Sequence, residues 1–196
     1  MRLFVAFEIP NETRAALAQL MARLKPKCPA AKWVRPEGMH VTLKFIGHVA
    51  DDRLGAIRDR LTAVRDDHPV EMRFRGLGFF PNDRRPRVLW CGVEASANAA
   101  TLAAAIDHSL AELGIELEAR PFTPHLTLAR FNSHELHQRG KRPPGLDEVI
   151  AIAHEAASQE FGGLHTCEFH LFESKLSPSG AQYSVIETFQ FAKASP

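Results

Sequence analysis

Apolar residues recur along this chain with two different spacings, and these spacings predict a mixed fold of strands and helices. Short apolar runs rich in β-branched and aromatic residues, bounded by Gly, Pro or Asn, are typical of strands. Strands are expected at residues 2–9, 32–35, 40–46, 70–74, 87–94, 116–119, 125–131, 164–176 and 182–191. Apolar residues three and four positions apart predict helices at residues 11–24, 52–64, 98–113 and 146–157.

Turn-forming residues separate these elements. Pro10 ends the first strand, and Gly114 follows the third helix at a suitable C-cap position. Residues 76–86 are rich in turn formers and residues 132–144 are polar, so both are expected to be loops. The sequence Ser-Pro-Ser-Gly at 177–180 predicts a hairpin between the last two strands. Helix-length connections within antiparallel sheets place the chain in the α+β class.

One short pattern occurs twice. Residues 35–43 and 120–128 both read Arg-Pro, three further residues, and then His-x-Thr-Leu. Because side chains on a strand alternate between its faces, each histidine shares a face with its threonine. These residues are His40 and Thr42 in the first copy and His125 and Thr127 in the second. The aliphatic residues that alternate with them are expected to face the core. The same alternation places Phe45 on the core-facing side.

The elements around the two copies follow a similar order. In each half a helix ends, a short strand follows, Arg-Pro marks a corner and the motif strand begins. We therefore expect residues 1–196 to form a single bilobal domain with two pseudo-symmetric antiparallel sheets and helices on the outer faces. The two motifs are expected to face each other across a central cleft.

Two histidines and two threonines in one cleft suit the chemistry of phosphate esters. Imidazole titrates near neutral pH, so His40 and His125 can act as a general acid and a general base. The hydroxyls of Thr42 and Thr127 can hydrogen-bond non-bridging phosphate oxygens. One His-x-Thr strand alone would be weak evidence, because threonine favours strands and histidine often packs at sheet edges. The signal lies in the repetition, and no nucleophilic Ser or Cys is required.

No metal or cofactor is expected. Residues 134–137 read His-Glu-Leu-His, which departs from the His-Glu-x-x-His spacing of zinc sites. The basic residues that follow would repel a cation. His165 and His170 fall on opposite faces of the strand expected over 164–176, so they form no site together.

Composition changes this picture mainly by exclusion. The chain has 196 residues, of which 45% are hydrophobic and 24% charged, and its formal net charge is +1. These values are ordinary for a globular protein and exclude a broadly basic surface. Three separated cysteines predict free thiols in a reducing compartment. Because no apolar run approaches membrane-spanning length, we expect a cytoplasmic protein that does not associate with membranes.

Other stretches are weaker candidates for function. The basic stretches at 84–87 and 139–142 are more typical of solvated loops than of phosphate sites. The aromatic residues suited to stacking on a nucleobase are Phe79, Phe80 and Trp33. There is no Gly-rich loop of the kind that binds nucleoside triphosphates.

Beyond the paired motifs, the chain resembles the 2H phosphoesterase superfamily. Within it, the chain is most similar to the bacterial and archaeal RNA 2′,3′-cyclic phosphodiesterases, also known as 2′-5′ RNA ligases. The stretches that carry this resemblance are residues 2–6, 40–47, 86–90, 124–130, 173–178 and 180–183. They span nearly the whole chain in the family's order. The paired motifs mark the superfamily, and the flanking stretches favour this branch.

The resemblance implies a bilobal α+β fold that hydrolyses RNA 2′,3′-cyclic phosphate ends to 2′-phosphates without metal or ATP. Relatives also join such ends through a 2′-5′ linkage. His40 would be the proton donor and His125 the proton acceptor, with Thr42 and Thr127 binding the substrate. Arg130 would contact the phosphate, although strand parity from His125 points it away from the cleft unless a bulge intervenes. RNA is the expected partner, and a monomer is the expected state.

Two other functions fit the same residues. A phosphodiesterase for small cyclic nucleotides or ADP-ribose cyclic phosphate would use identical chemistry and differ only in the length and charge of its pocket. A non-catalytic protein that binds RNA ends would more naturally use Arg and Lys than two histidines.

Overall fold

In a computed structural model of the protein, the described residues are 1–131, 143–177 and 180–193. Within them, the chain forms both strands and helices. The strands are β1 (Arg2–Glu8), β2 (Lys32–Trp33), β3 (His40–His48), β4 (Val70–Phe80), β5 (Val88–Ala95), β6 (His125–Arg130), β7 (Glu160–Thr166), β8 (Glu168–Ser177) and β9 (Gly180–Gln190). The helices are α1 (Asn11–Leu24), α2 (Leu54–Thr62), α3 (Asn98–Ala111) and α5 (Leu146–Glu155), with short 3-10 turns η1 (Pro36–Gly38) and η2 (Asp51–Arg53).

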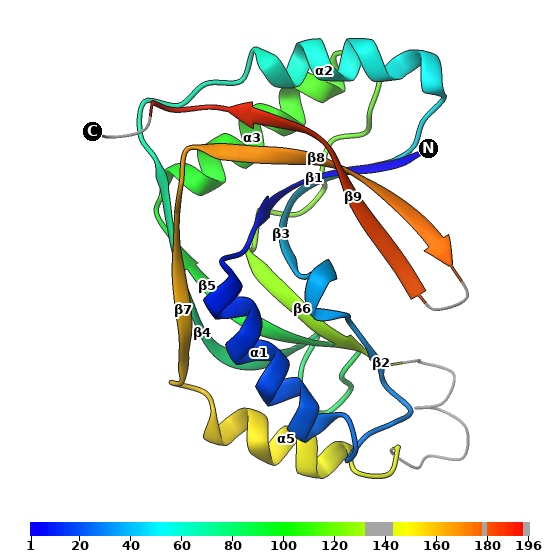
Figure 1. The fold of residues 1–196 in the computed structure, drawn as a ribbon, viewed down its shortest axis with the longest axis vertical. Coiled ribbons are helices and arrows are strands. Elements are labelled where there is room, and N and C mark those ends of the chain that lie inside the picture. Colours follow the sequence, from blue (N-terminus) through cyan, green and yellow to red (C-terminus); the bar gives the residue numbers. More distant parts are fainter. Residues whose placement is uncertain (132–142, 178–179, 194–196) are drawn as a thin grey trace.

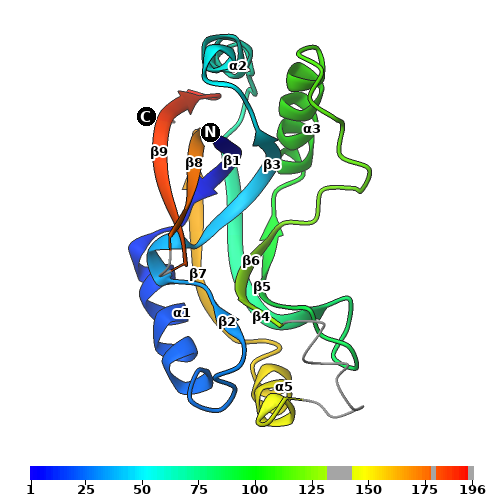
Figure 2. The ribbon, with the colours of Figure 1, turned by 90° about the vertical axis from the view of Figure 1, so that its right-hand side faces the viewer.

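The strands form two antiparallel sheets in separate lobes (Figures 1 and 2). The first sheet has the order β3-β1-β8-β9, and the second has the order β2-β6-β5-β4-β7. Helices α2 and α3 pack on the first sheet, whereas α1 and α5 pack on the second. The motif strands β3 and β6 belong to different sheets. The expected α+β architecture of two antiparallel sheets with outer helices is therefore confirmed.

The chain crosses repeatedly between the lobes and interlocks them. Strand β1 lies in the first sheet, but α1, which follows it, packs against β7 of the second sheet. Strand β5 lies in the second sheet, but α3, which follows it, packs against β3 of the first. Neither half of the sequence therefore builds a lobe by itself.

A continuous set of buried apolar side chains runs through both lobes. In β1, Leu3 and Val5 join this core, whereas Phe4 packs with Ala6 and Phe172 on the opposite face of the sheet. Burial on both faces is typical of a central strand. Helix α1 buries the face that its spacing predicts, with its apolar side chains directed into the same core.

The prediction of one continuous strand over residues 164–176 is wrong. The structure has two strands there, and they belong to different sheets. β7 ends at Thr166 and β8 begins at Glu168. The Thr166 hydroxyl hydrogen-bonds the backbone of Glu168 and closes the corner between them. No Gly or Pro marks this corner, so the apolar pattern reads as continuous. His165 and His170 therefore lie in different sheets, not on opposite faces of one strand.

The predicted end of the strand at 70–74 is also wrong, because the two glycines after it are interpreted as turn formers. Strand β4 continues to Phe80, through Gly76 and Gly78, which the sequence assigns to a turn. Gly78 pairs with Trp90 of β5, and a Cβ at this glycine would lie 2.3 Å from Cζ2 of the indole. Glycine therefore serves here to let a large ring lie across the strand. The strand expected at residues 116–119 is absent, since this stretch has no regular secondary structure.

Two expected turns fall largely outside the described residues. These are the polar loop at 132–144, described only from residue 143, and the tip of the 177–180 hairpin. Strands β8 and β9 nevertheless pair antiparallel, as the hairpin requires. Among the helices of the described ranges, none is both long and apolar enough to cross a membrane.

Candidate active site

Both motif strands carry a β-bulge directly after the motif threonine. In β3 the extra residue is Leu43, because its two neighbours pair with consecutive residues of β1. In β6 the extra residue is Leu128, because its neighbours pair with consecutive residues of β5. A bulge adds a residue to one strand only, so it re-aims the side chains that follow.

The bulges decide which side chains reach the cleft. Lys44 and Ala129, directly after the bulges, are buried. Phe45 and Arg130, one residue further, both line the pocket between the lobes. The expectation that Phe45 packs in the core is therefore wrong, and its side chain is 54% exposed. Strand alternation alone would point Arg130 away from the cleft, and the bulge at Leu128 turns it toward the cleft instead.

Strands β3 and β6 contact each other where the lobes meet (Figure 1), and both motifs line one pocket of about 510 Å³. The residues of the two motif strands that line the pocket are His40, Thr42, Phe45, Gly47, His125, Thr127 and Arg130. All five residues singled out as site residues from the sequence are thus brought together. A more open groove of about 590 Å³ on β4, β5 and β7 contains no residue of either motif.

His40 is enclosed by aromatic rings. The ring centroid of Phe4 lies 4.5 Å away, and Tyr183 stands edge-on at 5.1 Å. The pKa of His40 is lowered to about 4, and burial is the largest cause. The hydrogen bond to the Gly38 backbone acts in the opposite direction and raises the pKa, and repulsion from Arg130 and His125 lowers it. In the free protein this imidazole is therefore neutral at pH 7.

The two histidines are held in the same way. Nδ1 of His40 lies 2.8 Å from the carbonyl oxygen of Gly38, and Nδ1 of His125 lies 2.8 Å from that of Thr123. A carbonyl oxygen only accepts, so each Nδ1 carries the hydrogen and donates. In the neutral rings, Nε2 is then the nitrogen with a lone pair for chemistry. Each carbonyl belongs to the residue two positions before its histidine.

None of the three aromatic residues expected to stack on a base lines the pocket, although one of them contacts His125. Phe79 is buried, and the Trp33 indole N–H donates to the Cys28 carbonyl, 3.0 Å away. Phe80 stands edge-on to His125 with centroids 5.0 Å apart. Tyr183 has no role in the sequence-based site, although it lines the pocket. Only its place in the stretch 180–183, one of those that carry the family resemblance, could have indicated it.

The remaining candidates do not line the pocket or lie outside the described residues. In the stretch 84–87, the Arg84 and Arg85 N–H groups donate to the Asn82 side chain in the β4–β5 turn. Residues 134–137 and 139–142 lie outside the described residues. In the described part of the chain, no group of three or more His, Cys, Asp or Glu side chains is placed to hold a metal ion.

The pocket therefore combines two imidazoles, two hydroxyls and one guanidinium from two separate sheets. The imidazoles can transfer protons, and the hydroxyls and the guanidinium can bind the oxygens of an anionic phosphate. This set is suited to a proton-assisted displacement at phosphorus.

Comparisons with known proteins show the family of the chain. The family model described as LigT like Phosphoesterase matches residues 7–90 and 92–183. An Archaeoglobus fulgidus protein named RNA 2′,3′-cyclic phosphodiesterase is 33% identical over 97% of this chain and all of its own length. A Methanothermobacter thermautotrophicus protein of the same name is 32% identical over 96% of this chain and 98% of its own length.

A solved structure is similar to this chain in both fold and sequence. The crystal structure of the Thermus thermophilus protein TT0787 has a TM-score of 0.75 and 31% identity, with 97% of this chain and 98% of that chain covered. The matched regions include both motif strands and nearly every element of the two lobes. The chain belongs to the LigT-like phosphoesterase family.

Proposed function

We propose that this protein hydrolyses the 2′,3′-cyclic phosphate end of RNA to a 2′-phosphate, using His40 and His125 as acid and base. The observation that carries the proposal is that two His-x-Thr strands from different sheets converge, with Arg130, on one pocket. The names of the similar archaeal proteins support the choice of substrate.

The reaction is an in-line displacement at phosphorus. His125 takes a proton from water, whose oxygen attacks phosphorus from the side opposite O3′. The P–O3′ bond breaks, and His40 gives its proton to O3′. The product has a 2′-phosphate and a free 3′-hydroxyl. Thr42, Thr127 and Arg130 hold the non-bridging oxygens, on which negative charge builds up in the transition state. The acid, the base and the phosphate ligands are all side chains, so the proposed reaction requires no metal.

The donor role of His40 has to be reconciled with its environment. In the free protein the lowered pKa of His40 keeps the ring neutral at pH 7, whereas a proton donor must be protonated. Bound phosphate brings a negative charge that offsets the positive charge of Arg130. We infer that substrate binding raises the pKa of His40 and so prepares the acid.

The same site would join RNA ends when a 5′-hydroxyl replaces water. The 5′ oxygen would attack phosphorus, O3′ would leave with the proton from His40, and a 2′-5′ linkage would form. Hydrolysis and ligation would thus differ only in the nucleophile that occupies the position beside His125.

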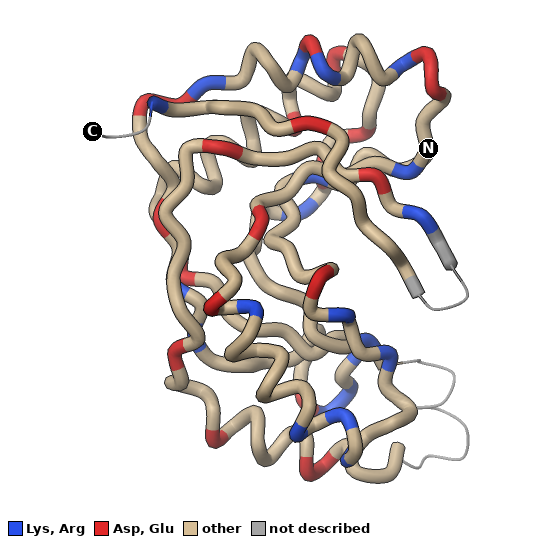
Figure 3. Tube along the Cα trace, viewed as in Figure 1, with Lys and Arg blue, Asp and Glu red and all other residues tan. Residues whose placement is uncertain are grey.

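RNA is favoured over a small cyclic nucleotide by the charge beyond the pocket. Lys32 of β2 is exposed and lies directly opposite Arg130 on the neighbouring strand, so it adds a second positive charge next to that of Arg130. Lys and Arg positions also gather along the side of the second lobe that faces the β8–β9 hairpin (Figure 3). A longer chain of phosphates would use these charges, whereas a mononucleotide would not.

Turnover on RNA ending in a 2′,3′-cyclic phosphate, compared with a cyclic mononucleotide, tests the proposal. We expect hydrolysis of both and a higher kcat/KM for RNA, by a chain acting as a monomer. Equal kcat/KM values would favour the small-molecule alternative. RNA binding with no turnover, unchanged after both histidines are replaced, would favour a non-catalytic binder.

A further inference from the structure

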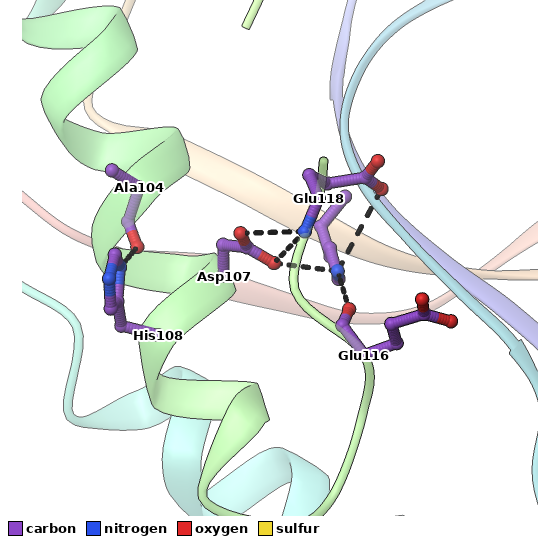
Figure 4. Close-up of polar contacts among 6 residues, drawn as sticks. Ala104, Asp107, His108, Glu116 and Glu118 are labelled. Atoms are coloured by element: carbon purple, nitrogen blue, oxygen red, sulfur yellow. Dashed lines mark hydrogen bonds and ion pairs between the residues drawn. The ribbon is translucent and has the colours of Figure 1, made fainter. Parts of the chain in front are cut away.

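A buried ion pair lies directly behind the first motif. Among the described residues, Lys44 is the one Lys or Arg that is buried, and its side chain is 1% exposed. Its Nζ lies 2.6 Å from Oδ1 of Asp107 and donates to the carbonyl oxygen of Glu116 at 2.5 Å (Figure 4). The carboxylate of Glu118 lies 3.8 Å from the same nitrogen.

These contacts join three parts of the fold. Lys44 belongs to β3, Asp107 to α3, and Glu116 and Glu118 to the irregular connection between α3 and β6. The carboxylate of Asp107 also accepts the backbone N–H of Glu118, at 3.0 Å from Oδ2. The connection that leads to His125 is thus tied to the strand that carries His40.

Stability alone does not account for a cation at this position. Removing a lysine from water is unfavourable, and a buried ion pair can often be replaced by apolar side chains without loss of stability. The equivalent position of the second motif, directly after its bulge, is occupied by Ala129, which is fully buried. The bulged strand can therefore be built with a small apolar residue there.

The neighbours of Lys44 indicate what the ion pair does. Lys44 sits between the bulge residue Leu43 and Phe45, which lines the pocket. A slip of the bulge by one residue would turn Phe45 away from the cleft, because neighbouring side chains on a strand point to opposite faces. The polar partners around Nζ make any such slip costly, since the charge would lose them while buried.

We propose that Lys44 is a positioning residue. Through Asp107 and the 116–118 backbone it fixes the register of the β3 bulge, holds Phe45 in the pocket, and couples this strand to the connection that enters β6. The expected effect of Lys44 on kinetics rests on the proposed function, because it is measured through turnover. The expected effect of Lys44 on the position of Phe45 does not depend on the proposed function.

The test compares two double variants. Lys44→Met/Asp107→Leu replaces the buried pair with apolar side chains, so neither charge is left buried and unpaired. Lys27→Met/Glu148→Leu removes an exposed ion pair, 2.6 Å long, that lies outside the pocket. Urea unfolding establishes that both variants fold before any kinetic value is compared.

We expect the Lys44/Asp107 variant to unfold at nearly the wild-type urea concentration and to show a KM raised by about tenfold, with a smaller change in kcat. The Lys27/Glu148 variant should keep wild-type kinetics. A wild-type KM in the Lys44/Asp107 variant would overturn the proposal, because the ion pair would then be structural only.

A readout without turnover separates this proposal from the proposed function. Phe4 and Phe45 are directly paired across β1 and β3, with ring centroids 6.2 Å apart. We expect the NMR cross-peaks between these rings to weaken in the Lys44/Asp107 variant and to persist in the control. Unchanged cross-peaks would contradict the positioning role even if the protein proved inactive on every cyclic phosphate.

Discussion

Phe45 and Arg130 occupy equivalent places in the two motifs, each five residues after its histidine and each brought into the same pocket by a bulge. The backbone of the site is therefore pseudo-symmetric, but its chemistry is not. An RNA end has a matching asymmetry, with a flat apolar base on one side of the ribose and an anionic phosphate on the other. We infer that Phe45 contacts the base and Arg130 the phosphate.

This asymmetry predicts different kinetic effects at the two positions. Phe45→Ala should raise KM by about tenfold with little change in kcat, because stacking is made equally in the ground and transition states. Arg130→Gln should lower kcat as well, by roughly 10- to 100-fold, because its charge opposes charge that builds up at phosphorus. Lys27→Ala is the control, since Lys27 is exposed and lies outside the pocket. Identical effects at both positions would contradict the division of roles.

The histidines should carry the proton transfers. His40→Ala and His125→Ala should each lower kcat by about 10²- to 10⁴-fold, as expected for a positioned acid or base. Thr42→Ala and Thr127→Ala should cost less, because each removes one hydrogen bond to the phosphate. Circular dichroism should show an intact fold in every variant. A His125→Ala protein with near-wild-type kcat would show that the two-histidine mechanism is wrong.

The environment of His40 predicts an unusual titration. Burial disfavours the charged ring, so its pKa of about 4 lies below the ordinary value of 6.5, and the ring takes up a proton only in acid. NMR of the ring protons should show this midpoint in the free protein and a higher one after addition of a nucleoside 2′-phosphate. Tyr183→Ala should raise the midpoint of the free protein by admitting water, whereas Tyr183→Phe should change it little. A midpoint near 6.5 in the wild type would contradict the account.

The same titration has a consequence for stability. Between pH 6.5 and about 4 the unfolded chain binds a proton at His40 that the folded protein does not bind. The free energy of unfolding should therefore fall as the pH drops through this window, and the fall should be smaller in His40→Gln. Parallel urea-unfolding curves at pH 7 and pH 4.5 measure the difference.

Chelation should leave the rate unchanged. The proposed acid, base and phosphate ligands are all side chains, so no step is assigned to a metal ion. The measurement is kcat on a cyclic phosphate substrate before and after dialysis against EDTA. A loss of activity that zinc or magnesium restores would overturn this part of the mechanism.

The arrangement of the site could be predicted largely because its pattern is local. His40 and Thr42 share a face through simple alternation, and so do His125 and Thr127. The helix at 11–24 follows directly from its apolar spacing and a proline at its start. Repetition of the motif indicates that two strands meet, although it does not indicate that the lobes exchange helices.

The errors arise where long-range contacts override local pattern. Alternation alone assigns Phe45 to the core, because a bulge depends on strand pairing and leaves no mark on the sequence of its own strand. Gly78 reads as a turn former, whereas it makes room for the Trp90 ring. The corner at Thr166 is closed by a side-chain hydrogen bond and has no Gly or Pro. The buried ion pair of Lys44 depends on partners in α3 and in the connection that follows it, so the sequence around Lys44 gives no indication of it.

The most direct test of the central claim is to identify the product formed from RNA that ends in a 2′,3′-cyclic phosphate. Phosphorus NMR, or digestion with a phosphatase of known specificity, locates the phosphate on the ribose. The account predicts a 2′-phosphate, formed with O3′ as the leaving group, and no product from His40→Ala or His125→Ala on the same time scale. A 3′-phosphate would contradict it, because O2′ would then leave and the roles given to His40 and His125 would no longer hold.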